Sequence, residues 1–332
     1  MTTIDIGRFS QAKILVVGDL MLDRYWWGTV DRISPEAPVP IVQLNGTSVK
    51  AGGAANVAAN IAGLGAKATL LGVTGEDTEA EELVSVLDGE PLIIKRFEAV
   101  AGRSTTVKTR IIAHDQHVVR LDREEKNPVP ETNAANIANS IKELIPEMDV
   151  VIVSDYAKGL LSPDLLGFIV DVAREHGAPV FADPKGKDFT KYHGVSMITP
   201  NLLEAANACG IEHNDPGLVS KAGSQLLRDL NAENVLITEG ANGMTLFGRT
   251  DRSTHFDAVA RTVYDVTGAG DTVIATLAVA AAAGLELEDA AMIANIAAGI
   301  AVGRVGTAVI SQAELAEAYA AAGSSGKRAQ QI

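Results

Sequence analysis

The chain has 332 residues, 47% hydrophobic and 21% charged, which is typical of a folded globular protein. At about 150 residues per domain this length fits roughly two domains or one large α/β domain. The formal net charge is −14. Nucleic acid and anionic membrane surfaces call for a basic excess, so neither is expected as a partner.

Cysteine content and terminal sequence point to the cytoplasm. A single cysteine, Cys209, excludes an internal disulfide and a Cys-rich zinc site, and it fits a reducing compartment. The N-terminus has no apolar core of the length that a signal peptide needs. The alanine-rich uncharged run Thr272 to Leu285 is too short to cross a bilayer.

Short apolar runs alternate with helical periods along the chain, which predicts a layered α/β fold. Most runs are apolar throughout, as parallel strands covered on both faces would be. The predicted strands are 13–19, 67–73, 149–155, 179–183, 196–200 and 234–240. Helical periods lie between the strands, for example at 54–64, 163–175 and 218–230, and close-packed helices are expected at 271–283 and 287–302.

Two stretches do not fit this alternation and predict a small projecting sheet. They lie within about 24–45 and 95–121, and both are β-branched with period-2 segments, as in antiparallel strands with one solvated face. Such an excursion with exposed aromatic residues is typical of a lid, a dimer contact or both. We expect a main domain over 1–322 and a disordered tail over 323–332.

The sharpest local motif is a small-residue turn, Gly268-Ala269-Gly270, that leads into a helix beginning near Asp271. Converging backbone N–H groups and the helix dipole would hold an anion there. Asp271 would draw the proton from a hydroxyl nucleophile as phosphoryl transfer proceeds. Taken alone, the motif also fits an ordinary N-cap and turn.

A second glycine-rich segment, Gly52 and Gly53 followed by Asn56, begins an alanine-rich helix. Bare backbone lets a ligand lie close, and the Asn56 amide offers a polyol both a donor and an acceptor. Tight packing of this helix on the sheet would explain the same residues.

Acidic residues stand where strands end. Asp19 and Asp23 follow the first predicted strand, Asp155 follows the third, and Asp183 follows the fourth. Ligands of open α/β sheets bind outside the carboxyl ends of the strands. One such carboxylate would more simply cap a helix, but four together favour a site that grips sugar hydroxyls.

Two further elements suit a nucleotide and its metal. Asn201 and Glu204 lie three residues apart at a helix start, where they would hold Mg²⁺ through water or simply form a capping box. The turn 238–243 after the last predicted strand would offer backbone donors to a phosphate, or would be a plain hairpin turn.

Basic residues cluster in this acidic chain. Lys108, Arg110 and Arg120 fall in the second lid stretch, and Lys185 and Lys187 follow Asp183 closely. Such groups would engage a phosphate already present on the substrate if the lid closes over the site. Solvated surface charge is the alternative for each of them.

Together and in this order, these elements resemble the ribokinase/PfkB carbohydrate kinase family. The two signature regions are AGGAANVAANIAGLGA (51–66) and DVTGAGDTVIATL (265–277). Five more stretches are similar to the heptose 7-phosphate kinases of that family. They are DRYWWGTVDRISPEAPVPIV, KTRIIAHDQHVVRLD, VSDYAKGLL, DPKGKDFTKYHG and ITPNLLEA. In related bifunctional proteins a nucleotidyltransferase domain follows, and we expect the kinase domain alone here.

The resemblance implies a three-layer α/β/α domain whose β-lid pairs between two subunits. It also implies ATP with Mg²⁺ as phosphoryl donor and the C1 hydroxyl of a heptose 7-phosphate as acceptor. By motif position Asp271 would be the base and Gly268 to Gly270 the anion hole. The expected cofactor residues are Asn201, Glu204 (to Mg²⁺ through water), Thr238, Gly240, Gly243 and Asn295.

For the sugar, the resemblance points to Asp19, Gly52, Gly53 and Asn56. From charge alone, we assign the substrate phosphate to Arg110, Arg120 and Lys185. A potassium site near Asp265 and Thr267 is an option that the family offers.

Alternative functions stay open. A kinase for another sugar phosphate or a nucleoside would carry the same motifs, and so would a non-catalytic sugar-binding module on this fold. An oxidoreductase is disfavoured, because no G-x-G-x-x-G follows residues 13–18.

Overall fold

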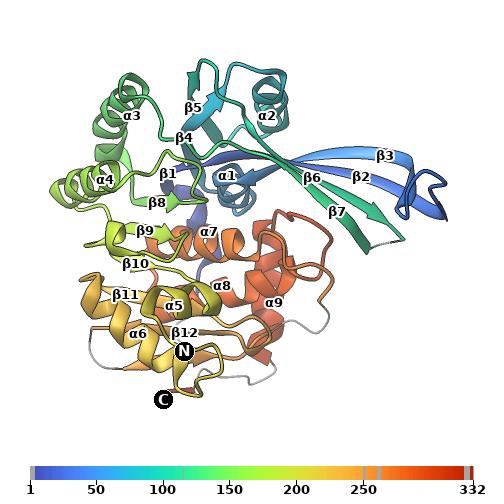
Figure 1. The fold of residues 1–332 in the computed structure, drawn as a ribbon. Coiled ribbons are helices and arrows are strands. Elements are labelled where there is room, and N and C mark those ends of the chain that lie inside the picture. Colours follow the sequence, from blue (N-terminus) through green and yellow to red (C-terminus); the bar gives the residue numbers. More distant parts are fainter. Residues whose placement is uncertain (1–3, 115, 250–251, 260–262, 325–329, 332) are drawn as a thin grey trace.

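The computed structural model describes residues 4–114, 116–249, 252–259, 263–324 and 330–331. Its strands form a large sheet in the body and a small sheet that projects from it (Figure 1). The strands are β1 Lys13–Gly18, β2 Leu20–Ile33, β3 Pro40–Gly53, β4 Lys67–Gly75, β5 Ile93–Val100, β6 Thr106–Ala113, β7 Gln116–Arg123, β8 Val150–Ser154, β9 Val180–Asp183, β10 Met197–Ile198, β11 Asn234–Thr238, β12 Met244–Gly248, β13 Ser253–Phe256 and β14 Gln330–Gln331.

Helices cover both faces of the large sheet. They are α1 Ala54–Gly63, α2 Thr78–Asp88, α3 Glu131–Leu144, α4 Pro163–His176, α5 Leu202–Cys209, α6 Leu218–Asp229, α7 Ala269–Ala282, α8 Leu287–Ala301 and α9 Gln312–Ser324. Short 3-10 helices lie at Ile6–Gln11, Ile145–Glu147, Thr190–Tyr192 and Gly240–Asn242.

The large sheet has the strand order β14-β13-β12-β11-β10-β9-β8-β1-β4-β5. Neighbours from β11 to β5 are parallel, and β12 to β14 extend the β11 edge antiparallel. All six strands predicted from apolar runs belong to the parallel part. The expected mainly parallel α/β architecture is therefore confirmed.

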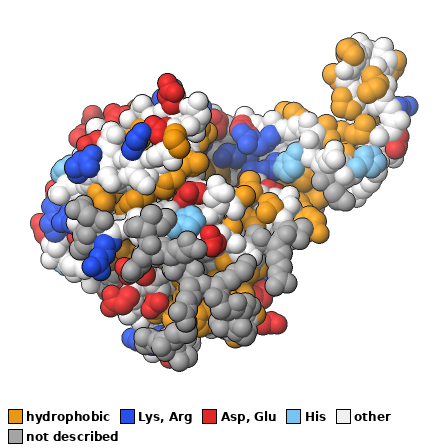
Figure 2. All heavy atoms as spheres, turned by 90° about the horizontal axis from the view of Figure 1, so that it is seen from below, with side chains coloured by type: hydrophobic (Ala, Val, Ile, Leu, Met, Phe, Trp, Pro, Cys, Tyr) orange, Lys and Arg blue, Asp and Glu red, His pale blue; other side chains and the backbone are white. Residues whose placement is uncertain are grey.

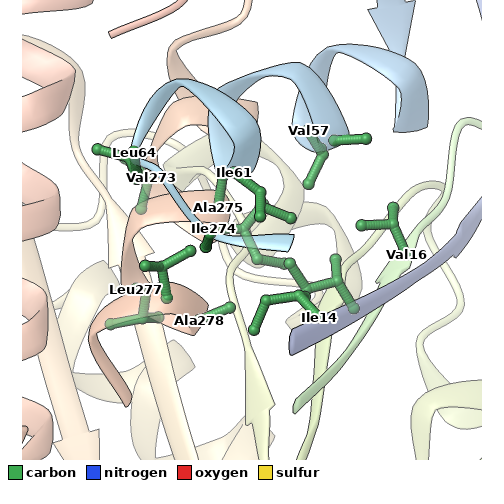
Figure 3. Close-up of a cluster of buried hydrophobic side chains, with 14 of the residues drawn as sticks. Ile14, Val16, Val57, Ile61, Leu64, Val273, Ile274, Ala275, Leu277 and Ala278 are labelled. Atoms are coloured by element: carbon green, nitrogen blue, oxygen red, sulfur yellow. The ribbon is translucent and has the colours of Figure 1, made fainter. Parts of the chain in front are cut away.

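Two apolar cores lie on opposite faces of this sheet. Ile14 and Val16 of β1 pack with α1, α7 and α8, and the small side chains of α7 allow these helices to approach closely (Figure 3). Leu15 and Val17 of the same strand face the other core, with α3, α4 and α6. Both sets of β1 side chains are fully buried. The burial on both faces explains why β1 is apolar throughout.

The small sheet is the predicted lid, with the order β3-β2-β6-β7. It reaches away from the body as an arm (Figure 1). Its central pair β2 and β6 is parallel, in contrast to the antiparallel pairing that we expected, and the outer pairs are antiparallel. The second lid stretch begins at Thr106 and not near 95, because β5 (Ile93–Val100) pairs in parallel with β4 in the large sheet.

The C-terminal segment departs from the expected disorder where it is described. Helix α9 continues to Ser324, and Gln330–Gln331 pair with β13 as β14. Residues 325–329 and 332 of the expected tail lie outside the described residues, and the domain boundary at 322 stays a prediction. Among the described helices, none has the length and apolar character that crossing a membrane requires.

Candidate active site

Three predicted acidic residues stand at the carboxyl ends of adjacent strands. Asp19 follows β1, Asp155 follows β8 and Asp183 ends β9. Strands β4 and β5 lie on one side of β1, whereas β8 to β11 lie on the other, so the strand order reverses between β1 and β8. Open α/β sheets bind ligands at such a switch point, outside the strand ends. The fold therefore places a ligand site beside Asp19 and Asp155.

Asp271 lies in the first turn of α7 and is joined to α1. The Asn56 amide Nδ2 donates to Asp271 Oδ2 at 2.7 Å, and both side chains are buried. Gly268 enters α7 with φ of +77°, and a Cβ there would lie 2.8 Å from Asn56 Nδ2. Glycine meets both restrictions. The two glycine-rich motifs thus meet at one carboxylate.

The Asp271 carboxylate is buried but still ionised at neutral pH. Burial raises its pKa to about 6, while hydrogen bonds from Asn56 and Tyr156 oppose that rise. The Tyr156 hydroxyl donates to Asp271 Oδ1 at 2.7 Å. A general base needs an ionised carboxylate with a pKa close to the working pH. Asp271 has the environment that its predicted role requires.

The start of α7 supplies part of the predicted anion hole. The first N–H groups of a helix lack partners within the helix, so they are available to an anion. The Ala269 amide, however, donates to Val266 O at 3.2 Å. This contact does not favour the assignment of Ala269 to the anion hole, whereas Gly270 stands at the exposed helix start.

Asp19 offers a carboxylate oxygen to a ligand. Its Oδ2 accepts from the backbone N–H groups of Tyr156, at 2.8 Å, and Lys158, at 3.0 Å. Its Oδ1 is buried and has no hydrogen-bond partner among the described residues. Burial, reinforced by the negative charge of Asp155, raises the pKa of Asp19 to about 6. An unpaired buried acceptor is costly, so a hydroxyl of a bound sugar would satisfy Oδ1.

Asp155, in contrast, is occupied by the protein itself. Its Oδ2 accepts from the Tyr192 hydroxyl at 2.6 Å and is paired with Lys191, and its Oδ1 accepts from the Ala157 amide at 2.7 Å. These contacts favour a structural role in the loop after β8 over the predicted contact with substrate.

Where the lid joins the body, the site contains a buried ion pair and a glycine beside it. Arg110 on β6 pairs with Asp23 on β2 at 2.5 Å, and both side chains are buried. Gly52 on β3 pairs with β2 near Asp23, and a Cβ at Gly52 would lie 2.8 Å from an Asp23 carboxylate oxygen. The Arg110 guanidinium is already paired with a carboxylate. This ion pair does not support the assignment of Arg110 to the substrate phosphate.

A cavity of about 790 Å³ extends from Asp271 across the carboxyl ends of β9, β10 and β11. The predicted nucleotide residues Thr238, Gly240, Gly243 and Asn295 all line it. Apolar walls come from α8 and from the segment before α7. The Asn295 amide donates to Asp257 O at 2.8 Å and so holds one edge of the wall. The structure brings together the set of nucleotide residues that the sequence predicted.

Asn201 and Glu204 form the capping box that the sequence left open as an alternative. Asn201 Oδ1 accepts from the Glu204 amide, and Glu204 Oε2 accepts from the Asn201 amide. Glu204 Oε1 pairs with Lys185 Nζ at 2.7 Å. Lys185 therefore lies on the nucleotide side of the cavity, which does not favour its assignment to the substrate phosphate. Asp183 lines the same side, and its pKa is raised well above its usual value by burial and by the charges of Asp271 and Glu204.

Asp265 organises its own loop. Its Oδ1 accepts from the amide and the hydroxyl of Thr267, and its Oδ2 accepts from the Gly306 amide at 2.9 Å. These bonds join the segment before α7 to the loop after α8. A monovalent cation at Asp265 and Thr267 stays a prediction.

Basic side chains gather where the arm meets the body (Figure 2). Arg120 is more than half exposed and pairs with Asp122, and Lys158 pairs with Glu124 at 2.5 Å. Lys108 is half-buried, lies 5.0 Å from the centre of the Tyr156 ring, and has no ion pair within the described part of the chain. Burial lowers the pKa of Lys108, the negative charge of Asp23 opposes this, and the positive charges of Lys158 and Arg120 add to it.

The arrangement of Asp271, Asp19 and the adjoining cavity is the one expected of the family that the sequence resembles, and a family comparison agrees. The model of the "pfkB family carbohydrate kinase" matches residues 11–314. The chain belongs to the pfkB family of carbohydrate kinases. The match spans both glycine-rich motifs and the lid, so the resemblance drawn from the sequence is confirmed.

Known relatives of this carbohydrate kinase include bifunctional proteins. It is 48% identical over 315 residues to "Bifunctional protein HldE" of Pseudomonas savastanoi pv. phaseolicola (strain 1448A / Race 6). It is 47% identical over 315 residues to the protein of the same name from Pseudomonas aeruginosa (strain UCBPP-PA14). Each alignment covers 95% of this chain and 65% of the relative, so the chain spans about two thirds of the length of these proteins.

Solved structures show the same fold. Phosphofructokinase-2 from Escherichia coli in complex with substrates and products superimposes with a TM-score of 0.80 at 19% identity, over 93% of this chain and 99% of that one. Arabidopsis thaliana ribokinase complexed with ribose and ATP gives 0.73 at 19% identity, over 92% and 98%. The ribokinase-like fold expected from the sequence is confirmed.

Two site residues of this carbohydrate kinase were missed at the sequence level. Tyr156 and Lys158 follow Asp155 in VSDYAKGLL, a segment noted only for its resemblance. Tyr156 contacts Asp271, while the Lys158 amide binds Asp19. A tyrosine and a lysine just after the carboxyl end of a predicted central strand were the available signal.

Proposed function

We propose that this kinase transfers a phosphoryl group from ATP to the C1 hydroxyl of D-glycero-β-D-manno-heptose 7-phosphate. The product would be the 1,7-bisphosphate, on the route to ADP-heptose and the lipopolysaccharide inner core. The observation that carries the proposal is the convergence of Asn56 and Asp271 next to the nucleotide cavity. The heptose assignment is supported by the five sequence stretches similar to heptose 7-phosphate kinases.

On the acceptor side, Asp271 takes the proton of the attacking hydroxyl. Its burial keeps competing water away, and the N-terminus of α7 stabilises negative charge that develops on the transferred group. Asp19 Oδ1 accepts a hydrogen bond from another sugar hydroxyl, which orients the ring. Positioning of this kind supplies most of the catalysis in phosphoryl transfer.

On the donor side, the cavity between β11 and α8 takes the nucleotide. Thr238, Gly240 and Gly243 lie on the wall where phosphates would run, and Asn295 on the wall that would border the base. Glu204 would hold Mg²⁺, which when bound would neutralise negative charge on the phosphates. Both Glu204 oxygens already have protein partners, which fits a metal that keeps its waters and contacts Glu204 only through them.

For the substrate phosphate, Lys108 is a better candidate than the residues first assigned. Arg110, Arg120 and Lys185 each pair with a carboxylate, whereas Lys108 lacks an ion pair among the described residues. Its position over the Tyr156 ring keeps it next to the acceptor site. A phosphate that reaches Lys108 would provide the missing anion.

We also propose a location in the cytoplasm and a homodimer, and the lid supports the homodimer. Its outer strand β7 exposes Val118, Val119 and Leu121, and the β2–β3 arm exposes Ile33 and Leu44. Apolar side chains cover the arm toward its tip (Figure 2). A second subunit's lid would bury this surface. We further propose that a K⁺ ion binds near Asp265 and Thr267.

The test is an assay of ATP consumption with a panel of sugars and sugar phosphates, with phosphorus NMR to locate the new phosphate. We expect a new anomeric C1 phosphate with heptose 7-phosphate and much slower reaction with the unphosphorylated heptose. Preference for another sugar phosphate or a nucleoside would overturn the substrate assignment. Binding without ATP consumption would show a sugar-binding module instead.

A further inference from the structure

The base Asp271 is held from both sides. The Asn56 amide donates to Oδ2 and the Tyr156 hydroxyl to Oδ1, each at 2.7 Å. A carboxylate oxygen has two lone pairs, so each oxygen still has room for an incoming hydroxyl. The two donors leave Asp271 one orientation, and they come from opposite sides of the site: Asn56 from α1, and Tyr156 from the loop after β8.

The loop that carries Tyr156 is fixed through its backbone. The amides of Tyr156 and Lys158 both donate to Asp19 Oδ2, and the amide between them donates to Asp155. Ala157 has φ of +55°, a left-handed conformation that residues with a side chain rarely adopt. Such strain persists only where the surroundings impose it. The loop therefore delivers the Tyr156 hydroxyl to a defined place.

The hydroxyl stays protonated, which makes it a donor and not a second base. Burial and the negative charge of Asp271 raise the pKa of Tyr156 well above its usual value. Lys108 lies over the ring and adds a cation on its face. A donor this close favours the ionised form of Asp271, against the burial that opposes ionisation.

We propose that Tyr156 is the positioning residue that keeps the base of this kinase ionised and oriented. The inference rests on the proposed function only in taking Asp271 as the base, whichever sugar is the acceptor. Tyr156 makes no proton transfer itself. It acts on the proton affinity and the direction of the Asp271 carboxylate, so its removal should affect kcat and its pH dependence more than the binding of ATP.

The test replaces Tyr156 by Phe and measures kcat/KM against pH with the best acceptor and saturating ATP. The variant loses the hydrogen bond to the ionised Asp271 carboxylate. The acidic limb of the kcat/KM profile should therefore move to higher pH by roughly one to two pH units. The rate relative to wild type should then be at least tenfold lower at pH 6.5 and recover in part by pH 9. Titration of a substrate phosphate affects both enzymes equally. The charges of Asp23, Asp183 and Lys108 also act on this site, and Asp19 has a pKa of about 6, but the substitution leaves all four groups in place. The difference between the two pH profiles therefore reports Asp271.

Tyr192→Phe is the matched control, because it removes a 2.6 Å bond from a buried tyrosine to Asp155 without touching Asp271. Its acidic limb should stay in place. A loss of activity in Tyr156→Phe that is equal at every pH, or an unmoved limb, would overturn the proposal. Absence of turnover in the wild type with every acceptor would instead overturn the proposed function.

A second measurement does not depend on activity. Aspartate carboxyl carbons labelled with ¹³C, with Asp271→Asn to assign the signal, give the titration of Asp271 directly. In the wild type, the ring carbon bearing the Tyr156 hydroxyl should respond with the same midpoint as Asp271. The Asp271 midpoint should rise in Tyr156→Phe. A Tyr156 signal indifferent to the titration of Asp271 would contradict the assignment even if the variant did not fold.

Discussion

Asn56 and Asp271 are hydrogen-bonded at 2.7 Å although 215 residues separate them in the chain. The bond belongs to a buried polar network between α1 and α7. The Asn60 amide donates to Asn56 O at 3.0 Å, and the Thr272 hydroxyl donates to Asn60 Oδ1 at 3.3 Å. The network sets the direction of the Asp271 side chain relative to α1, which begins after Gly53. The packing of α1 against α7 therefore also determines where the proposed base lies.

Replacement of Asp271 by Asn should lower kcat by about 10²- to 10⁴-fold, the usual contribution of general-base catalysis. The amide cannot accept the proton of the attacking hydroxyl. ATP affinity should change little, because Asp271 stands at one end of the cavity, whereas Thr238, Gly240, Gly243 and Asn295 line the part that we assign to the nucleotide. Steady-state rates and calorimetric titration with ATP and Mg²⁺ measure the two effects, and Asp164→Asn on α4 serves as a surface control. Near-normal turnover would refute the role of Asp271.

Replacement of Asn56 by Leu should both destabilise the fold and raise the pKa of Asp271. The change removes one donor to the buried carboxylate and the side-chain contact from Asn60 Nδ2 to Asn56 Oδ1, which costs roughly 1 to 3 kcal/mol of unfolding free energy. Asn60→Leu is the comparison, since it breaks the same network without touching Asp271. Denaturant unfolding should show losses in both variants, whereas only Asn56→Leu should move the acidic limb of kcat/KM. Equal pH profiles would show that Asn56 is only structural.

The parts of the site that local sequence determines were predictable. A glycine turn at a helix start and an aspartate at a strand end define their own geometry, so Asp271, Asn56 and Asp19 fall where the motifs placed them. The partners of charged side chains depend on segments distant in the chain. The bond of Tyr156 to Asp271 and the pairing of Lys185 with Glu204 cross between separate elements, and no local pattern reports them.

The lid boundary was wrong for a physical reason. Strand β5 is at the edge of the large sheet, and over 93–97 its exposed side chains alternate with buried or half-buried ones. A lid strand alternates in the same way. Periodicity alone cannot tell an edge strand of the body from a strand of the arm, whereas the fully apolar central strands were placed correctly.

The two glycines at the start of α7 should differ in their tolerance of a side chain. Gly268→Ala places a Cβ 2.8 Å from the Asn56 amide at a positive φ, which we expect to cost roughly 1 to 3 kcal/mol and to displace Asn56 from Asp271. A Cβ at Gly270 meets nothing within 4 Å, so Gly270→Ala should keep full stability. Thermal and denaturant unfolding measure both. Equal stabilities would contradict the close contact.

Replacement of Lys108 and replacement of Lys185 should have different effects on substrate preference. Lys108→Met should lower kcat/KM for heptose 7-phosphate at least tenfold and change that for the unphosphorylated heptose little, because a charge-assisted contact to phosphate is lost. Lys185→Met should act on ATP, since Lys185 pairs with Glu204 beside the nucleotide cavity. Lys126→Met, at a surface lysine paired with Glu124, is the matched control. If only Lys185→Met loses the preference for heptose 7-phosphate over the unphosphorylated heptose, the substrate phosphate is bound by Lys185, as first assigned from the sequence.

Burial of Asp271 should also appear in the pH dependence of stability. Its pKa is about 6 in the folded chain against 3.8 as the ordinary value, so the folded state binds its proton more tightly than the unfolded state does. The stability that this group contributes is full below pH 3.8 and is lost as the pH rises through 6. The Asp271→Asn variant has no carboxyl group at this position and does not lose this stability. The difference in unfolding free energy, variant minus wild type, should therefore rise by roughly 1 to 2 kcal/mol between pH 5 and pH 8.

The comparison uses differences between the two proteins at each pH, which removes the titration of every other group that the substitution leaves unchanged. Asp19 has a raised pKa of about 6 as well, and it remains in both proteins. Asp183 also remains, and because the charge of Asp271 raises its pKa, the loss of that charge acts in the same direction as the expected rise. Urea unfolding at pH 5, 6, 7 and 8 gives the four differences. A constant difference would mean that Asp271 titrates near its ordinary pKa when folded. In that case the two donors, Asn56 and Tyr156, outweigh the cost of burial, and the base would be ionised well below neutral pH.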